Sequence, residues 1–255
     1  MQGFLKSIVA LVSLTFLISG GCLMAQNAPV KNVVLVHGAF ADGSSWSKVI
    51  PLLQAKGYHV TSVAIPLTSF ADDVAATKRA VAAEDGPVVL VGHSYGGVVI
   101  TEAGNDSKVV RLVYVAAFAP DAGQDINEIS KPFPPPPGLT KVKPLTDGFI
   151  LLTPDGIETA FAQDLTKEEK ALIIAVQPQT ALAIFGAKPT AAAWHTKSTW
   201  YVVSSNDRMI APEQEKSMAK QMNAATTVLP SSHVAMLSHP TEVAKVIDDA
   251  AAGKK

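Results

Sequence analysis

Short apolar runs rich in β-branched residues alternate with amphipathic segments from residue 32 onward. A short apolar run between polar or glycine-containing segments predicts a strand buried on both faces, whereas apolar residues three and four positions apart predict a helix. The predicted strands cover residues 32–36, 58–65, 87–92, 109–117, 199–205 and 225–229, and the predicted helices cover 44–57 and 70–84 and begin at Ser94, Pro212 and Pro240. This alternation predicts an α/β fold with a mostly parallel central sheet of about six strands flanked by helices.

The alternation stops between residues 120 and 193. The stretch KPFPPPPGL (131–139) cannot form a central strand, because consecutive prolines supply no backbone donors and favour an extended polyproline conformation. The stretch LTKEEKALIIAVQ (165–177) predicts a helix, with Thr166 and Glu169 spaced as a capping box. Long insertions in compact domains are usually functional, so we interpret 120–193 as a lid within a core of residues 26–119 and 194–255. A proline-rich surface loop without a role is the alternative.

The first 25 residues have the layout of a secretory signal peptide. A short start carrying Lys6 is followed by an apolar run, Ile8–Ile18, and then by small residues up to Ala25. We therefore expect cleavage after Ala25 and an exported protein, periplasmic or extracellular, with no membrane span in the mature chain. A membrane anchor is the alternative, because residues 8–25 carry no charge. Cys22, the only cysteine, would allow lipid anchoring, a minority interpretation.

Composition limits the remaining possibilities. The 255 residues are 48% hydrophobic and 17% charged, as expected for an ordinary globular protein with one sizeable core. The net charge of −1 leaves no basic excess to neutralise a phosphate backbone, which argues against nucleic acid as a partner.

One serine stands between two glycines directly after the apolar run at 87–92. The sequence GHSYG (92–96) fits the pattern G-x-S-x-G, in which the serine occupies a sharp turn between a strand and a helix. A serine hydroxyl is a poor nucleophile and needs both an adjacent base and an exposed position. The context predicts Ser94 as a nucleophile, with an ordinary helix-capping serine as the alternative.

Such a nucleophile requires an acid and then a histidine later in the chain. Asp207 follows the strand predicted at 199–205, and His233 lies four residues after the strand predicted at 225–229. Asp121, which follows an earlier strand, is the competing acid. The other five histidines belong to turns, to a strand start, to the end of the lid or to the residue before a helix proline: His37, His59, His93, His195 and His239.

A carbonyl oxygen attacked by Ser94 becomes negatively charged and needs two backbone N–H donors. The residue after the nucleophile, Tyr95, is expected to supply one. The loop after the first strand is expected to supply the other, from Ala39 or, as second choice, Phe40, because Gly38 allows the chain to turn there.

Four motifs together carry a family resemblance: VLVHGAFADGSSW, VGHSYGG, NDRMIAPE and SSHVAMLSHP. The chain resembles the α/β-hydrolases, within them the group of bacterial esterases related to plant salicylate and jasmonate methyl esterases and to hydroxynitrile lyases. The resemblance implies the α/β-hydrolase fold, a catalytic triad of Ser94, Asp207 and His233, an oxyanion hole of Ala39 and Tyr95, and no cofactor or metal.

The resemblance also distinguishes this chain from members of the family that have other activities. Cyanide-releasing lyases of the family carry threonine at the position of Gly38 and lysine after the catalytic histidine, where this chain has Val234. Epoxide hydrolases and haloalkane dehalogenases have an aspartate nucleophile, which Ser94 excludes. The proline run of the lid has no match in the plant enzymes, so their substrates do not transfer.

The combined prediction is a serine esterase that cleaves small apolar carboxylic esters through an acyl-enzyme. Thioesterase or lactonase activity stays open, as does a small-molecule sensor on the same fold. The lid supplies apolar side chains for a substrate pocket or for its own core, and Phe40 and Phe133 are the two specific pocket candidates. The lid side chains are Phe133, Leu139, Phe149, Ile150, Phe161 and Phe185.

Overall fold

The computed structural model describes residues 30–255. The predicted signal peptide, its cleavage site and Cys22 therefore lie outside the described residues. Within residues 30–255, no helix combines the length and the apolar character needed to cross a bilayer.

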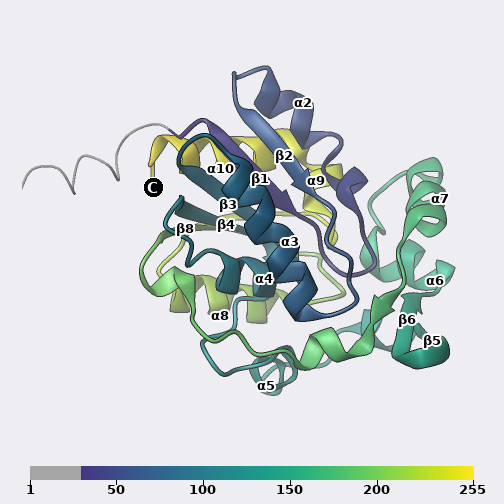
Figure 1. Ribbon diagram of the computed structural model, residues 1–255. Coiled ribbons are helices and arrows are strands. Elements are labelled where there is room, and N and C mark those ends of the chain that lie inside the picture. The colour runs from purple at the N-terminus through teal and green to yellow at the C-terminus, as the bar shows by residue number, and fades with distance from the viewer. Residues whose placement is uncertain (1–29) are drawn as a thin grey trace, which may run out of the picture.

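A six-stranded sheet forms the centre of the molecule (Figure 1). Its strands lie in the order β2-β1-β3-β4-β8-β9, and every neighbouring pair is parallel. β1 and β3 are buried along their whole length, because helices cover both faces of the sheet. The predicted α/β fold is confirmed. The strands are β1 (Asn32–Val36), β2 (His59–Val63), β3 (Val88–Ser94), β4 (Val109–Ala117), β8 (Ser198–Ser204) and β9 (Ala225–Leu229).

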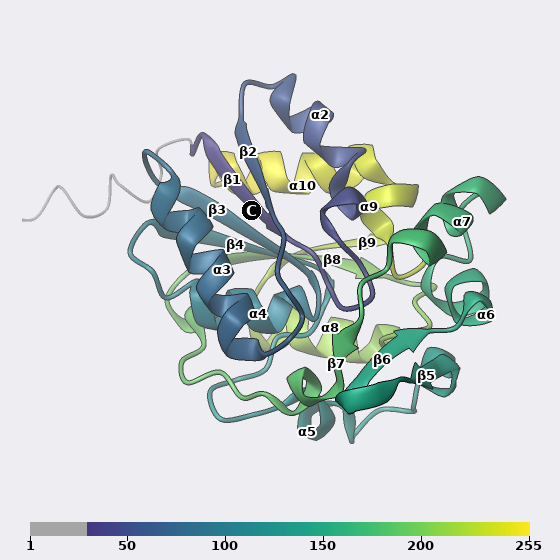
Figure 2. The ribbon, with the colours of Figure 1, turned by 45° about the vertical axis from the view of Figure 1, so that its right-hand side comes forward.

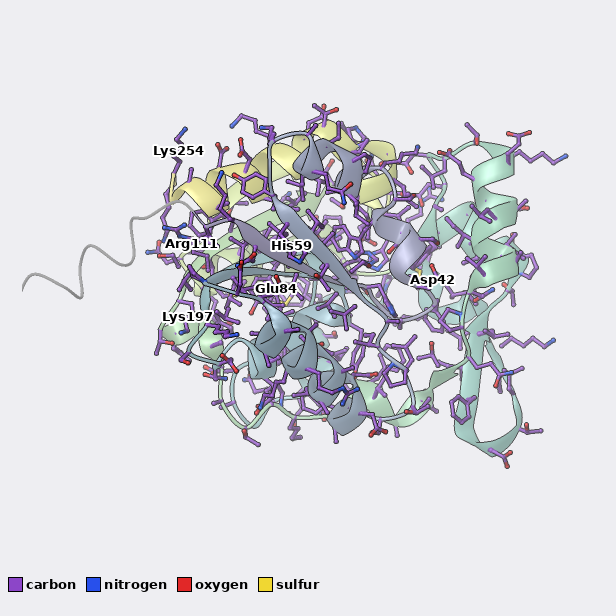
Figure 3. The ribbon with its side chains drawn as sticks, turned by 45° about the horizontal axis from the view of Figure 1, so that its top comes forward. Asp42, His59, Glu84, Arg111, Lys197 and Lys254 are labelled. Atoms are coloured by element: carbon purple, nitrogen blue, oxygen red, sulfur yellow. The ribbon has the colours of Figure 1, made fainter. Side chains whose placement is uncertain are left out.

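Helices form a layer on each side of this sheet, as Figure 2 shows. One layer holds α2 (Val49–Gln54), α9 (Ala235–Ser238) and α10 (Pro240–Ala252), and the other holds α3 (Phe70–Ala83), α4 (Gly96–Ala103) and α8 (Pro212–Gln221). At the far end from the lid, the buried Arg111 of β4 donates from Nη1 to the Ala251 carbonyl at 2.6 Å (Figure 3). This bond holds the end of α10 against the sheet.

Two predicted helices differ from the structure. The helix expected over 44–57 is a 3-10 helix at Gly43–Trp46 followed by the short α2. The helix expected to begin at Ser94 begins at Gly96, and Ser94 is the last residue of β3. The φ of Ser94 is +52°, which a right-handed helix does not allow, so the turn must be completed first.

The predicted lid, residues 120–193, contains short elements beside the carboxyl ends of the central strands. Its longest helix, α7 (Lys167–Val176), begins with the predicted capping box of Thr166 and Glu169. A three-stranded antiparallel sheet was not predicted, because strands of two to four residues are too short to show alternation. The other elements are α5 (Ile126–Ser130), β5 (Val142–Pro144), β6 (Phe149–Leu152), α6 (Pro154–Gly156), a π turn at Ile157–Phe161, β7 (Thr180–Ala181), and 3-10 helices at Pro137–Lys141, Thr146–Gly148, Leu182–Gly186 and Ala193–His195.

β7 fastens the lid to the core. The Ala181 N–H donates to the Leu67 carbonyl at 2.9 Å, and the fully buried Thr180 hydroxyl accepts from the Phe40 N–H at 3.3 Å. In contrast, α7 has no buried residue. Its Glu169 meets the core through Lys48, at 2.5 Å between two solvent-accessible side chains.

Candidate active site

The predicted nucleophile occupies a strained turn between β3 and α4. Ser94 has φ +52°, a left-handed conformation that costs a residue with a Cβ on the order of 1–2 kcal/mol. Neighbouring backbone fixes this conformation through close approach. A Cβ on Gly92 would lie 2.6 Å from the Gly96 carbonyl oxygen, and a Cβ on Gly38 would lie 2.7 Å from Cβ of Ser94. These glycines are therefore needed for packing around the turn.

The predicted acid and base are bonded to each other. Asp207 follows β8, His233 follows β9, and His233 Nδ1 lies 2.5 Å from Asp207 Oδ2. Asp207 Oδ1 accepts from the N–H groups of Met209 at 2.6 Å and Ile210 at 3.0 Å. A carboxylate can only accept, so the imidazole carries its proton on Nδ1 and leaves the Nε2 lone pair as the base. Both side chains are almost completely buried, which holds this geometry.

Ser94 and His233 line one cavity of about 620 Å³ between the core and the lid. Both pocket candidates, Phe40 and Phe133, line it as well. Phe149 does not line it; this ring packs, partly buried, against the hydrophobic core. The other lid side chains named from the sequence all line the cavity: Leu139, Ile150, Phe161 and Phe185. Its wall is therefore mainly apolar, with the predicted nucleophile and base exposed to its interior.

Two backbone donors are available beside the nucleophile. Among the described residues, the N–H groups of Ala39 and Tyr95 donate to no protein acceptor. The Phe40 N–H, the second choice from the sequence, donates to the Thr180 hydroxyl. Ala39 lines the cavity with Ser94, so the free donors are the two expected first. The Thr180 contact was missed, because nothing in the sequence relates a lid threonine to this loop.

The side chain of Tyr95 points away from the cavity and anchors the turn. Its hydroxyl donates to Asp73 Oδ2 at 2.8 Å, and Asp73 Oδ1 accepts from the Leu67 N–H at 2.8 Å. Burial raises the pKa of both the Tyr95 phenol and the Asp73 carboxyl. Asp73 was not predicted as a site residue, because an acidic residue in the first turn of a helix is usually a solvated end charge.

A second buried acid, Glu215, lies beside Asp207. Its side chain is fully buried, and Oε2 accepts from the Ser204 N–H at 2.9 Å. Within residues 30–255, Oε1 has no hydrogen-bond partner. Burial, and then the charge of the neighbouring Asp207, raise the pKa of Glu215 well above its usual value. The Glu215 carboxyl therefore favours its neutral form. Glu215 was not predicted as a site residue, because its position in the first turn of α8 also suits an exposed end charge.

The remaining histidines have other partners. His93 Nε2 donates to the His233 carbonyl at 3.0 Å, and burial lowers the pKa of His93 well below its usual value, so the ring is neutral. His37 Nε2 accepts from the Ile65 N–H, and its Nδ1 donates to the Gly38 carbonyl. His59 pairs with Glu84 at 3.4 Å (Figure 3), and His239 Nδ1 bonds to the Ser238 hydroxyl.

The competing acid lies elsewhere. Asp121 pairs with His195 at 2.9 Å, and both side chains are solvent-accessible. The structure therefore brings Asp207, and not Asp121, to His233. In the described part of the chain, no group of three or more His, Cys, Asp or Glu side chains is arranged to hold a metal ion.

Residues 33–246 match the alpha/beta hydrolase family, and the chain belongs to it. It is 25% identical over 243 residues to the alpha/beta hydrolase nvfD of Aspergillus novofumigatus, covering 86% of this chain and 96% of that protein. It is 32% identical over 116 residues to methylesterase 8 of Arabidopsis thaliana, covering 40% of this chain and 43% of that protein. Its fold is similar to that of polyneuridine aldehyde esterase, with a TM-score of 0.73 and 22% identity, covering 86% of this chain and 98% of that one. The family resemblance inferred from the four motifs is confirmed.

Proposed function

We propose that this protein is a serine esterase that hydrolyses neutral carboxylic esters through an acyl-enzyme. The proposal is based on the arrangement of three side chains. Ser94 and His233 line the same cavity, and His233 is bonded through Nδ1 to the buried Asp207. Relatives named as methylesterases support ester hydrolysis as the reaction.

The first step transfers a proton and forms a bond. His233 Nε2 takes the proton of the Ser94 hydroxyl while Oγ attacks the ester carbonyl carbon. The Asp207 carboxylate stabilises the imidazolium that forms. The negative charge on the carbonyl oxygen is stabilised by the N–H groups of Ala39 and Tyr95, each worth roughly 3 kcal/mol in the transition state.

The second step releases both products. His233 donates its proton to the alkoxy oxygen, the alcohol leaves, and Ser94 is left acylated. Water then gives a proton to Nε2 and attacks the acyl carbon, and the carboxylic acid departs as Ser94 recovers its hydrogen. No step needs a metal or a redox partner.

Turnover of a panel of p-nitrophenyl esters by wild type and the Ser94→Ala variant tests this proposal. We expect steady multiple turnovers from wild type and a loss of several orders of magnitude in the variant. A fluorophosphonate probe should label wild type and not the variant, and Ser107→Ala, at an exposed turn, is the control. Full activity without Ser94 would reject the proposal, and a single stalled acylation would indicate a sensor instead.

We also propose export of the chain, which rests on the layout of residues 1–25. Mass spectrometry of the mature protein expressed with its full N-terminus checks this. A new N-terminus near residue 26 is expected, and an intact Met1 would contradict it.

A further inference from the structure

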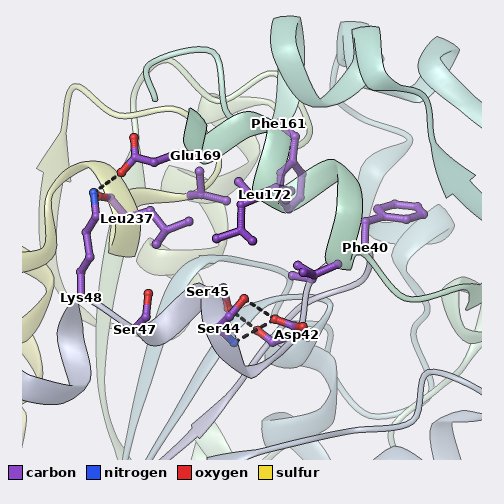
Figure 4. A pocket seen from close by; sticks show the side chains of 14 residues that line it. Phe40, Asp42, Ser44, Ser45, Ser47, Lys48, Phe161, Glu169, Leu172 and Leu237 are labelled. Carbon is purple, nitrogen blue, oxygen red and sulfur yellow. Dashed lines mark hydrogen bonds and ion pairs between the residues drawn. The ribbon is translucent and has the colours of Figure 1, made fainter. Parts of the chain in front are cut away.

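A second, smaller cavity adjoins the large one. Its volume is about 170 Å³. In Figure 4 the Lys48–Glu169 ion pair lies at one side of it and Phe40 and Phe161 lie at the other, with Leu172 between them. The cavity is bordered by the loop after β1 and the residues up to Lys48, by α7 of the lid, and by Val234 and Leu237 after His233.

The smaller cavity is separated from the predicted base by the Phe161 ring. Phe40 and Phe161 line both cavities, so these two rings form the boundary between them. The Phe161 ring centroid is 5.2 Å from that of His233, and Val234, the next residue, lines the smaller cavity. Ser94 and His233 line only the larger of the two.

The geometry of acyl transfer assigns the two halves of an ester to the two cavities. In the tetrahedral intermediate, one oxygen points to the N–H groups of Ala39 and Tyr95. The alkoxy oxygen must lie beside His233 Nε2, because His233 protonates it as it leaves. The alcohol half therefore extends on the side of His233, toward Phe161 and the smaller cavity. The acyl half is left with the larger cavity.

The lining of the smaller cavity favours a neutral, apolar group. Lys48 and Glu169 neutralise each other at 2.5 Å, and the Asp42 carboxylate accepts from the N–H and the hydroxyl of Ser44. The remaining wall is mainly aliphatic, and two of its side chains are unusually exposed, Leu172 at 57% and Val176 at 37%. An apolar cavity of about 150 Å³ holds one benzene molecule, so a single ring fits this one.

We propose that the smaller cavity is the alcohol subsite and that it accepts an apolar alcohol about the size of benzyl alcohol. The proposal rests on the esterase function proposed above. It predicts a preference for esters whose alcohol half carries one ring, whatever acyl group the larger cavity takes.

A matched pair of variants separates the two cavities. Leu172 lines only the smaller cavity and Leu182 only the larger, and both are 57% exposed. We expect Leu172→Trp to fill the smaller cavity and to lower kcat/KM for benzyl butyrate about 10-fold relative to methyl butyrate, a size typical of pocket discrimination. Leu182→Trp should lower kcat/KM for methyl 4-phenylbutyrate relative to methyl butyrate and spare the benzyl ester. Equal effects of Leu172→Trp on the benzyl and methyl esters, or no effect on either, would overturn the proposal.

Binding without turnover distinguishes this proposal from the esterase function itself. Calorimetry with the Ser94→Ala variant should show that adding Leu172→Trp weakens binding of benzyl butyrate about 10-fold. If wild type hydrolysed no ester but this weakening were observed, the esterase proposal would fail while the cavity remained a ligand site. Unchanged binding of benzyl butyrate would reject the subsite, whatever the activity of wild type.

Discussion

The two halves of the candidate active site present different kinds of side chain to the cavity. On the core side, Asp207 and His233 are buried and bonded to each other, and backbone N–H groups hold the carboxylate. On the lid side, the cavity is walled by apolar side chains, of which Leu139 and Leu182 are 56% and 57% exposed. Directional hydrogen bonds require particular residues, whereas apolar contact depends on area and shape. The core half is therefore expected to set the chemistry and the lid half the selectivity.

The largest loss of activity is expected from His233→Ala. Loss of the base should lower kcat by about 10⁴-fold or more, because the nucleophile then has no proton acceptor. Steady-state kinetics on a p-nitrophenyl ester checks this, with His195→Ala as the control at an exposed position. A loss below 10-fold would show that chemistry does not depend on the core half.

A smaller loss is expected from Gly38→Ala. The added Cβ would lie 2.7 Å from Cβ of Ser94, so the turn or the loop must shift. Displacement by a fraction of an ångström to an ångström in such a site costs about 10²-fold in rate. Fluorophosphonate labelling rates would measure the effect, and a thermal unfolding curve would show that the variant is folded. Unchanged labelling would mean that this close approach is not needed.

Glu215 tests whether a neutral acid supports the core half. Its folded-state pKa is raised by burial, so wild type loses stability as pH rises from the unfolded-state pKa of about 4.3 toward the folded one, by up to about 1.4 kcal/mol per pH unit. Glu215→Gln keeps an acceptor for the Ser204 N–H but does not titrate. The variant should therefore gain stability relative to wild type as pH rises.

Urea unfolding of both proteins between pH 5 and 8 measures this difference. Glu215→Leu is the control, because it leaves the buried Ser204 N–H without its acceptor and should cost about 1–3 kcal/mol relative to Gln. If the difference in free energy of unfolding between wild type and Glu215→Gln does not change with pH, Glu215 is ionised in the folded protein.

The smallest effect is expected on the lid side. Leu139→Ser should raise KM for an apolar ester by about 2- to 5-fold and leave kcat unchanged, because the side chain binds ground state and transition state alike. Its exposure predicts a stability change within about 0.5 kcal/mol. A kcat that fell as steeply as in Gly38→Ala would remove the distinction between the two halves.

The sequence predicted the core half because its features are local. Ser94, Asp207 and His233 each follow a buried apolar run, and carboxyl ends of parallel strands meet at one edge. The prediction that the helix begins at Ser94 was wrong, because hydrophobic periodicity does not reveal a left-handed residue between a strand and a helix. The helix, α4, begins at Gly96. The small lid sheet was missed because its strands are so short.

Other features depend on contacts between segments far apart in the chain. The neutrality of Glu215 follows from burial under β8, and the contact of Thr180 with Phe40 joins residues 140 positions apart. Periodicity and motif spacing carry no information about such contacts. The sequence identifies which side chains of the lid are apolar, but it does not show which of them line the cavity. Phe149 is an example, because it packs against the core and does not line the cavity.

The attachment of β7 determines where access to the interior can change. Thr180 and Ala181 bond to Phe40 and Leu67 from buried positions, so separating that strand from the core would break shielded hydrogen bonds and remove the acceptor of the Phe40 N–H. Moving α7 would separate the solvated Lys48–Glu169 ion pair and the partly buried contacts of Ile173 and Ile174 with the core. We therefore expect α7 to move away from the core more readily than β7.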